Sequence, residues 1–168
     1  MLQAHFDEIS KLVYCNEHAT LISVSWDRSI AIHSESEAEE GVLLRRILNS
    51  HKNDITALDH SHNLSLIATG SADSAVKVWD YEFCRMEGTL SAHTSPITCL
   101  KFLNPFPILM SCDAGGNVML WATRPSRSKN KLLARWKNRP SDAENGGKSY
   151  ATAITTATIS CKFNIGKS

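Results

Sequence analysis

The chain has 168 residues, of which 42% are hydrophobic and 21% charged, and its formal net charge is +1. This composition is typical of one folded domain, and the near-neutral balance gives no general attraction to nucleic acid or membrane. No run of 18 apolar residues predicts a transmembrane helix, and the first residues lack the pattern of a secretory signal. Five scattered cysteines without a Cys-x-x-Cys pair favour reduced thiols in a cytoplasmic protein over a disulfide framework or zinc site.

A spacing of residue types repeats three times along the chain. The pairs His5 and His33, His51 and Trp79, and His93 and Trp121 are each 28 residues apart. An isoleucine follows each first histidine by four residues, and a leucine comes three residues later. Repeats of about 40–45 residues are typical of stacked or circular architectures.

The first repeat, about residues 5–49, ends its third strand at Ile30-x-Ile32-His33 and continues through an acidic loop, residues 34–41. The second, about 50–91, reads as four short strands: 55–60, 66–69, 75–79 and 85–90. The third, about 92–138, repeats this order and ends in an outer strand near 131–136. A polar loop is expected over 139–150, and 151–168 resembles the start of a fourth unit. Short apolar runs punctuated by turns predict an all-β protein.

Four strands per repeat predict propeller blades, so the expected fold is a β-propeller fragment of three four-stranded blades plus the first strand of a fourth. Propellers have about four to eight blades, and we therefore expect no closed ring from these residues alone. The ring would be completed by further repeats in a longer chain or by a second chain. We expect the two open faces to carry Ile30, Ile32, Val118 and Leu120.

The segment from His51 to Asp80, which ends in Val78-Trp79-Asp80, resembles a WD repeat (β-transducin-like). This resemblance covers residues 5–121 in three copies and implies a buried tetrad in the second blade, made of His51, Thr69, Asp73 and Trp79. In the first blade His33 replaces the tryptophan. In the third blade Gly115 stands at the aspartate position, and whether Asp113, two residues earlier, compensates is left open.

Two other interpretations of these polar residues are weaker. Thr69, His51 and Asp73 could form a hydrolase triad, but no oxyanion-stabilising motif accompanies them, so we expect no enzyme activity and no cofactor. Asp59-His60-Ser61-His62 offers several metal ligands, but neighbouring strand residues point to opposite faces. We therefore expect no metal site there.

The WD-repeat resemblance implies partner binding on the narrow top face, at positions fixed relative to the histidine and the turn aspartate. Trp26 is the strongest candidate because tryptophan often carries interface energy, although it could instead pack on a neighbouring loop. Glu8 and Asp54 favour a basic ligand segment. The predicted positions are Glu8, Ser10 and Trp26 in blade one, Asp54, Thr56 and Ala72 in blade two, and Pro96, Thr98 and Ala114 in blade three.

The expected function is a non-catalytic scaffold that binds other proteins. The runs 81–88, 103–107 and 121–125 resemble large EF-hand and WD-repeat proteins of cilia and flagella, which implies a cytoskeletal or ciliary assembly. The alternative is an RNA- or chromatin-associated propeller that uses the basic stretch 124–139, although basic residues on an outer strand also discourage edge pairing. These residues are Arg124, Arg127, Lys129, Lys131, Arg135, Lys137 and Arg139.

Overall fold

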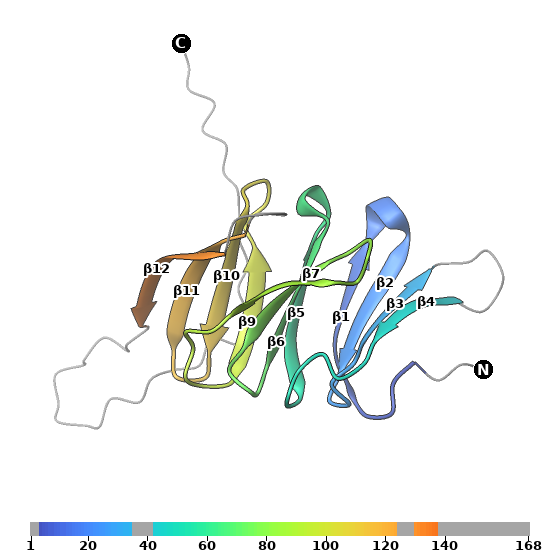
Figure 1. Cartoon of the computed structure of the whole chain (residues 1–168), viewed down its shortest axis with the longest axis horizontal. Coiled ribbons are helices and arrows are strands. Elements are labelled where there is room, and N and C mark those ends of the chain that lie inside the picture. Colours follow the sequence, from blue (N-terminus) through green and yellow to red (C-terminus); the bar gives the residue numbers. More distant parts are fainter. Residues whose placement is uncertain (1–3, 35–41, 124–129, 138–168) are drawn as a thin grey trace, which may run out of the picture.

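The computed structural model describes residues 4–34, 42–123 and 130–137, and within them the fold is all-β (Figure 1). Three antiparallel sheets of four strands follow one another along the chain. The first holds β1 (Ile9–Cys15), β2 (Thr20–Ser25), β3 (Ile30–Ser34) and β4 (Val42–Ile47); the second β5 (Ile55–Ser61), β6 (Leu66–Ser71), β7 (Val76–Asp80) and β8 (Met86–Leu90); the third β9 (Ile97–Phe102), β10 (Ile108–Asp113), β11 (Asn117–Ala122) and β12 (Lys131–Lys137). Two short 3-10 helices, η1 (Asn16–His18) and η2 (His62–Leu64), follow β1 and β5.

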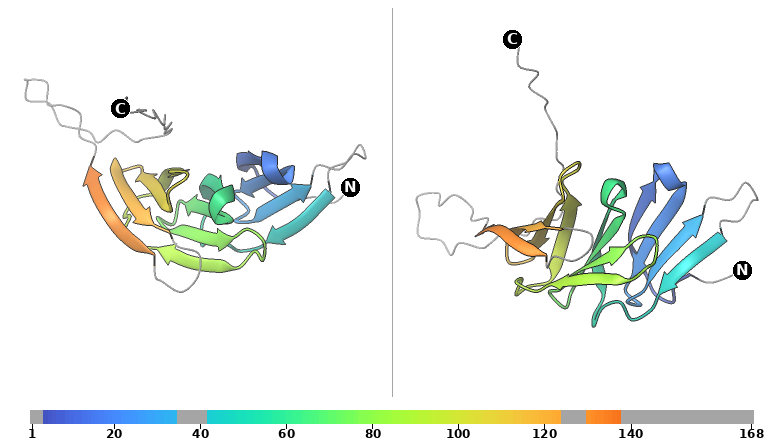
Figure 2. Two further views of the ribbon diagram at one scale, coloured as in Figure 1. Left: turned by 90° about the horizontal axis from the view of Figure 1, so that it is seen from above. Right: turned by 45° about the horizontal axis from the view of Figure 1, so that its top comes forward.

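The strands of each sheet pair in chain order, so every sheet is a simple meander. The first strands β1, β5 and β9 lie next to one another, and the last strands β4, β8 and β12 form the outer rim of an arc (Figure 2). This arrangement confirms the prediction of three four-stranded blades. The strand expected within 151–168 and the loop 139–150 lie outside the described residues, and the exact blade boundaries stay a prediction. No helix in the described part of the chain is long and apolar enough to cross a membrane.

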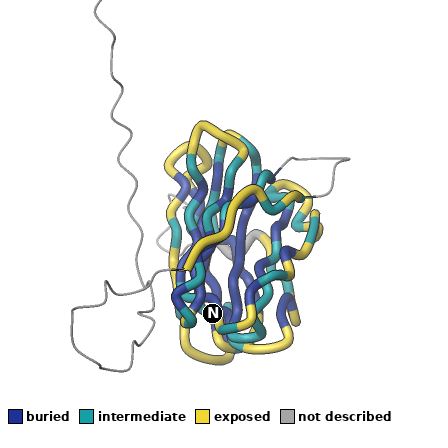
Figure 3. The backbone as a smooth tube through the Cα atoms, turned by 90° about the vertical axis from the view of Figure 1, so that its left-hand side faces the viewer, coloured by how far each residue is buried: buried dark blue, intermediate teal, exposed yellow. Residues whose placement is uncertain are grey.

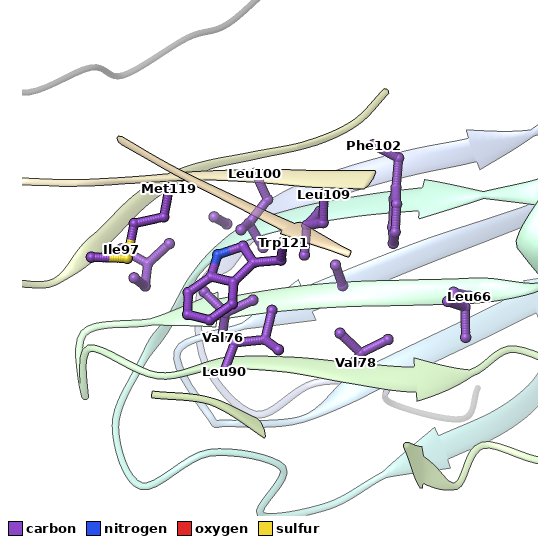
Figure 4. Packing of buried hydrophobic residues seen from close by; sticks show 12 residues of the cluster. Leu66, Val76, Val78, Leu90, Ile97, Leu100, Phe102, Leu109, Met119 and Trp121 are labelled. Carbon is purple, nitrogen blue, oxygen red and sulfur yellow. The ribbon is translucent and has the colours of Figure 1, made fainter. Parts of the chain in front are cut away.

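The hydrophobic core lies between the blades, because each sheet is apolar on both faces. One cluster joins blades one and two: Ile22, Val24, Ile30 and Ile32 pack against Ile55, Leu58, Ile67 and Trp79. A second joins blades two and three around Trp121, which lies close to Val76 and Leu90 (Figure 4). The buried residues follow the centres of the strands, and the turns are exposed (Figure 3).

The sequence-based prediction of the open faces was wrong for blade one. Ile30 and Ile32 are 0% and 3% exposed, because blade two covers them. On blade three Val118 packs with Cys99 and Cys112 of its own blade, on the face turned away from blade two, as predicted, and it is nevertheless buried. Leu120 is half-buried. The residues that blade one exposes are Ile9 and Leu12, at 53% and 56%. Both come from the first strand, whose face away from blade two has no neighbour among the described residues.

Candidate functional site

Blade two contains a continuous chain of hydrogen bonds across its sheet. The indole Nε1 of Trp79 on β7 donates to Oγ1 of Thr69 on β6 over 2.8 Å. Oγ1 of Thr69 lies 2.8 Å from Nε2 of His51, and Nδ1 of His51 lies 3.3 Å from Oδ2 of Asp73. Because each of these polar atoms has a partner, the blade can enclose four such side chains without leaving a buried polar atom unsatisfied.

Blade three forms the same chain with an aspartate from a different position. Nε1 of Trp121 donates to Oγ of Ser111 over 2.8 Å, and that Oγ lies 2.6 Å from Nε2 of His93. Nδ1 of His93 lies 2.8 Å from Oδ2 of Asp113, whose exposed fraction is 0%. Asp113 therefore does compensate, and blade two is not the sole blade with a complete tetrad.

Asp113 is the last residue of β10 and not part of the turn, and Gly115 explains how its carboxylate still fits into the tetrad. A Cβ atom at Gly115 would lie 3.3 Å from Oδ1 of Asp113 and 3.0 Å from Oγ of Ser95, which is closer than ordinary contact. The glycine leaves room for the displaced carboxylate. Asn117 then donates to Oδ1 of Asp113 from its backbone N–H over 2.9 Å and from its side-chain Nδ2 over 3.0 Å.

Blade one holds a modified network. Nε2 of His5 lies 2.7 Å from Oγ of Ser23, but Nδ1 lies 2.7 Å from Oγ of Ser29, which donates in turn to Asp27 over 2.6 Å. His33 occupies the place of the tryptophan, and its Nε2 is 3.4 Å from Oγ of Ser23. Nδ1 of His5 also lies 3.4 Å from Oδ1 of Asp27, so the Ser29 hydroxyl bridges the histidine and the aspartate in addition to their direct contact. The last link, from Ser23 to His33, is longer than in the other blades.

The electrostatics of the blade-two tetrad favour a neutral histidine beside an ionised carboxylate. Burial, with a smaller effect from the nearby Lys77 ammonium, lowers the pKa of His51 to about 4 despite the attraction of Asp73. Burial alone would raise the pKa of Asp73, but hydrogen bonds from the backbone N–H groups of Lys52 and Ala75, together with His51, outweigh it and lower the pKa. At neutral pH the tetrad is therefore a fixed hydrogen-bond network with one negative charge.

The same geometry argues against a hydrolase triad. Thr69 is 0% exposed and His51 is 3% exposed, so neither side chain can reach a substrate. The hydroxyl that would have to act as nucleophile already accepts the indole N–H of Trp79. This network is built to stabilise the sheet.

The predicted top-face residues lie at the end of the blades where the tetrad aspartates are, which we call the tetrad end; it is the lower end of the sheets in Figure 1. In each blade the residue three after the histidine accepts a backbone hydrogen bond from the β-turn that follows the second strand. These bonds run from the N–H of Trp26 to Glu8 (3.0 Å), from Ala72 to Asp54 (2.9 Å) and from Ala114 to Pro96 (2.8 Å). Two positions that are distant in sequence therefore meet once per blade.

The hydroxyl side chains among the predicted surface residues point into the protein. Ser10 Oγ donates to the carbonyl of Ile55, and Thr56 Oγ1 donates to the carbonyl of Ile97. Each of these two bonds joins one blade to the next. Thr98 Oγ1 donates to the carbonyl of Cys112 over 3.3 Å. Ser10 and Thr56 thus hold neighbouring blades together, while the Thr98 bond stays within blade three. A ligand would therefore meet mainly Trp26, which is 42% exposed, and the exposed Glu8 and Pro96 beside the half-buried Asp54.

Of the predicted basic stretch, the structure describes Lys131, Arg135 and Lys137, all exposed on β12. β12 is the outermost strand of blade three, where charge opposes edge-to-edge pairing. Arg124, Arg127, Lys129 and Arg139 lie outside the described residues. Asp59, from the dismissed metal motif, instead bridges two blades: it accepts the backbone N–H of Phe102 over 2.6 Å and pairs with Lys101 over 3.0 Å.

Comparison with known proteins agrees with this geometry. The sequence model of the family "WD domain, G-beta repeat" matches residues 42–80 and 84–122. Among curated proteins, the chain is 33% identical over 79 residues to nuclear distribution protein PAC1 of Tuber melanosporum, covering 46% of this chain and 18% of that protein. It is 32% identical over 89 residues to the CCR4-associated factor 4 homolog of Vanderwaltozyma polyspora, covering 52% of this chain and 13% of that protein. The chain thus spans less than a fifth of the length of these relatives.

Solved structures show the same fold. The chain resembles the WD40 repeats of RRP9 with a TM-score of 0.72 and 20% identity, over 82% of this chain and 41% of that one. The structure of U3-55K matches with the same values. The meandering four-stranded sheets and the buried tetrads define a blade-built β-propeller protein. Through its two matched repeats and this fold, the chain belongs to the WD-repeat family.

Proposed function

We propose that this protein is a non-catalytic scaffold that binds other proteins through the tetrad end of its blades. The observation that carries the proposal is the position of Trp26: a large aromatic side chain, 42% exposed, held on a turn whose backbone is tied to Glu8, directly before the first strand of the same blade. A rigid, partly exposed tryptophan supplies contact area at a low entropic cost.

The chemistry around Trp26 favours a ligand segment with basic character. The backbone bond between Trp26 and Glu8 holds the two residues next to each other, and Asp54 occupies the same position in the next blade. Carboxylates beside an aromatic anchor attract cationic side chains and orient them. Ser10 and Thr56 take part indirectly, because their hydrogen bonds fix the spacing of the blades that carry these contacts, and Thr98 ties the first two strands of blade three together.

The finer part of the proposal is a role in a cytoskeletal assembly in the cytoplasm. It is supported by the curated relatives named nuclear distribution protein PAC1 and nudF, which occur in several fungi. A ciliary assembly rests on the resemblance of the segments 81–88, 103–107 and 121–125 alone. We do not favour a nucleic-acid ligand, because the described residues of the basic stretch, Lys131, Arg135 and Lys137, lie on the outer strand of blade three and away from Trp26.

The test is affinity purification of the tagged protein from its own cells, with partners compared between the wild type and Trp26→Ala. Trp136→Ala is the matched control, because Trp136 is also a tryptophan, is 46% exposed and lies on the outer strand β12. We expect Trp26→Ala and the double change of Glu8 and Asp54 to lysine to lose the partners, with melting temperatures unchanged.

Retention of all partners by Trp26→Ala and their loss in Trp136→Ala would overturn the assignment. Recovery of RNA in a salt-dependent manner, abolished by neutralising Lys131, Arg135 and Lys137, would instead support the nucleic-acid alternative.

A further inference from the structure

At the end of the blades opposite to the tetrads, metal-ligating side chains from two blades meet. Cys15 is the last residue of β1, His18 lies in η1, and His62 begins η2. The two 3-10 helices lie side by side along the upper edge of Figure 1. One ligand atom from each of the three residues lies within 4.8 Å of the other two. None of these residues belongs to the tetrads or to the proposed protein-binding surface.

We propose that Cys15, His18 and His62 form a zinc site that clamps blade one to blade two. A thiolate and two imidazoles are the donor set that Zn²⁺ prefers, at bond lengths of about 2.3 Å to sulfur and about 2.0–2.1 Å to nitrogen. Ligand atoms in such a tetrahedron are about 3.3 to 3.6 Å apart, so the present spacing needs side-chain movements of about 1 Å.

Glu17, which is exposed and not one of the three clustered ligands, would turn toward them to provide the fourth ligand of the proposed site. Its Oε2 atom lies 3.6 Å from Sγ of Cys15, which matches the separation of about 3.5 Å between a sulfur and an oxygen ligand on one zinc ion. A thiolate and a carboxylate would together neutralise the charge of Zn²⁺. The site would then bury no net charge beside the hydrophobic core, which lowers its desolvation cost.

The surroundings of the cluster also fit a ligand role for the histidines. The Nδ1 atom of His62 is buried and has no hydrogen-bond partner, and the same holds for Nε2 of the neighbouring His60. Buried polar atoms of this kind are rare and call for a partner. The ring of His18 stacks on Tyr81 at 5.1 Å between centroids, and Tyr81 donates or accepts a hydrogen bond of 2.7 Å with Thr20. These contacts position one ligand ring and link it to both blades.

The proposed experiment uses the full, reduced chain freed of metal and titrated with Co²⁺, a spectroscopic substitute for Zn²⁺. We expect one equivalent of Co²⁺ to produce a thiolate-to-metal charge-transfer band, and Zn²⁺ to remove it. Zn²⁺ should also raise the melting temperature, since a ligand that binds only the folded state stabilises it.

Three variants separate the site from other thiols. Cys15→Ser should abolish the band. His18→Gln changes an exposed residue and should fold normally, yet it should weaken Zn²⁺ binding by more than about tenfold, the loss that even supporting residues cause. Cys84→Ser, which changes a half-buried thiol outside the cluster, is the matched control and should behave as the wild type. No band in the wild type, a band that persists in Cys15→Ser, or unchanged affinity in His18→Gln would overturn the proposal.

Discussion

Blades one and two carry the same residues at equivalent positions of their first strands, but bury them very differently. Ile55 and Leu58 are 0% and 8% exposed, whereas Ile9 and Leu12 are 53% and 56% exposed. The strands pair in the same way: Ile9 lies opposite Ser25 as Ile55 lies opposite Ser71. The difference is that blade one covers Ile55 and Leu58, while no described residue covers Ile9 and Leu12.

This comparison shows that the repeat pattern determines the strands, and the neighbouring blade determines how much each strand contributes to stability. At about 25 cal/mol per Å² of buried apolar surface, the same isoleucine is strongly stabilising in one blade and nearly neutral in the other. The tetrads of these two blades differ in the same direction. Trp79 both completes a network and packs on blade one, whereas His33 does neither to the same extent.

The largest effect is expected from Trp79→Ala. It removes a buried aromatic ring and leaves Thr69 without its indole donor, and should cost about 3–5 kcal/mol of unfolding free energy. His33→Ala should cost much less, because His33 is half-buried and its contact with Ser23 is 3.4 Å long. Chemical denaturation of the two variants measures both values. Equal losses would contradict the distinction between the two blades.

The comparison between the first strands can be tested by paired truncations. Ile55→Ala should cost about 2–5 kcal/mol, the range for buried aliphatic residues. Ile9→Ala should stay within about 0.5 kcal/mol, as exposed substitutions usually do. The loss of stability in both variants is measured from the shift of the denaturation midpoint. A large loss for Ile9→Ala would show that some other part of the protein covers this face.

The tetrad of blade three gives a smaller but more specific prediction. Asp113→Ala leaves Nδ1 of the buried His93 unpaired and should cost about 1–3 kcal/mol. Asp73→Ala, which removes the partner of His51 in blade two, should cost about as much, because both carboxylates have the same role. If Asp113→Ala were as stable as the wild type while Asp73→Ala was not, Asp113 would not stabilise blade three as a tetrad member.

A further expected effect is a dependence of stability on pH. Burial lowers the pKa of His51 to about 4 from an ordinary value of 6.5, so the unfolded chain binds this proton first. Stability from this group is therefore complete above about pH 6.5 and is lost as the pH falls toward 4. Calorimetry should find a lower melting temperature at pH 4.5 than at pH 7.5. His51→Gln should reduce that difference; an unchanged pH profile in this variant would contradict the assignment.

Much of the fold could be predicted from the sequence because the repeat is carried by local spacing. The 28-residue interval between His51 and Trp79 and the alternating apolar residues determine strands that pair with their sequence neighbours. Asp113 was not predicted as the tetrad member, because the alignment marks Gly115 at that position and does not show that a residue from the strand end can fill the space. The signal was present in the glycine itself, which makes room for a carboxylate.

The cluster of Cys15, His18 and His62 could not be found by spacing, because His62 is 44 residues beyond His18 in another blade. Only the packing of β1 against β5 brings η1 and η2 together. The open face of blade one was mispredicted for a related reason: alternation identifies two faces of a strand, but not which of them the next blade covers. Ile30 and Ile32 faced the neighbour, and Ile9 and Leu12 did not.

Hydrogen exchange of the backbone amides tests the central claim, that coverage by neighbouring blades determines stability along this repeat. β2 and β6 are equivalent second strands, each paired on both edges, but blades one and three cover both faces of β6 while blade two covers one face of β2. We predict markedly slower exchange of the backbone amides in residues 66–71 than in residues 20–25 of the 168-residue chain. Equal protection of the two strands, or faster exchange in β6, would contradict it.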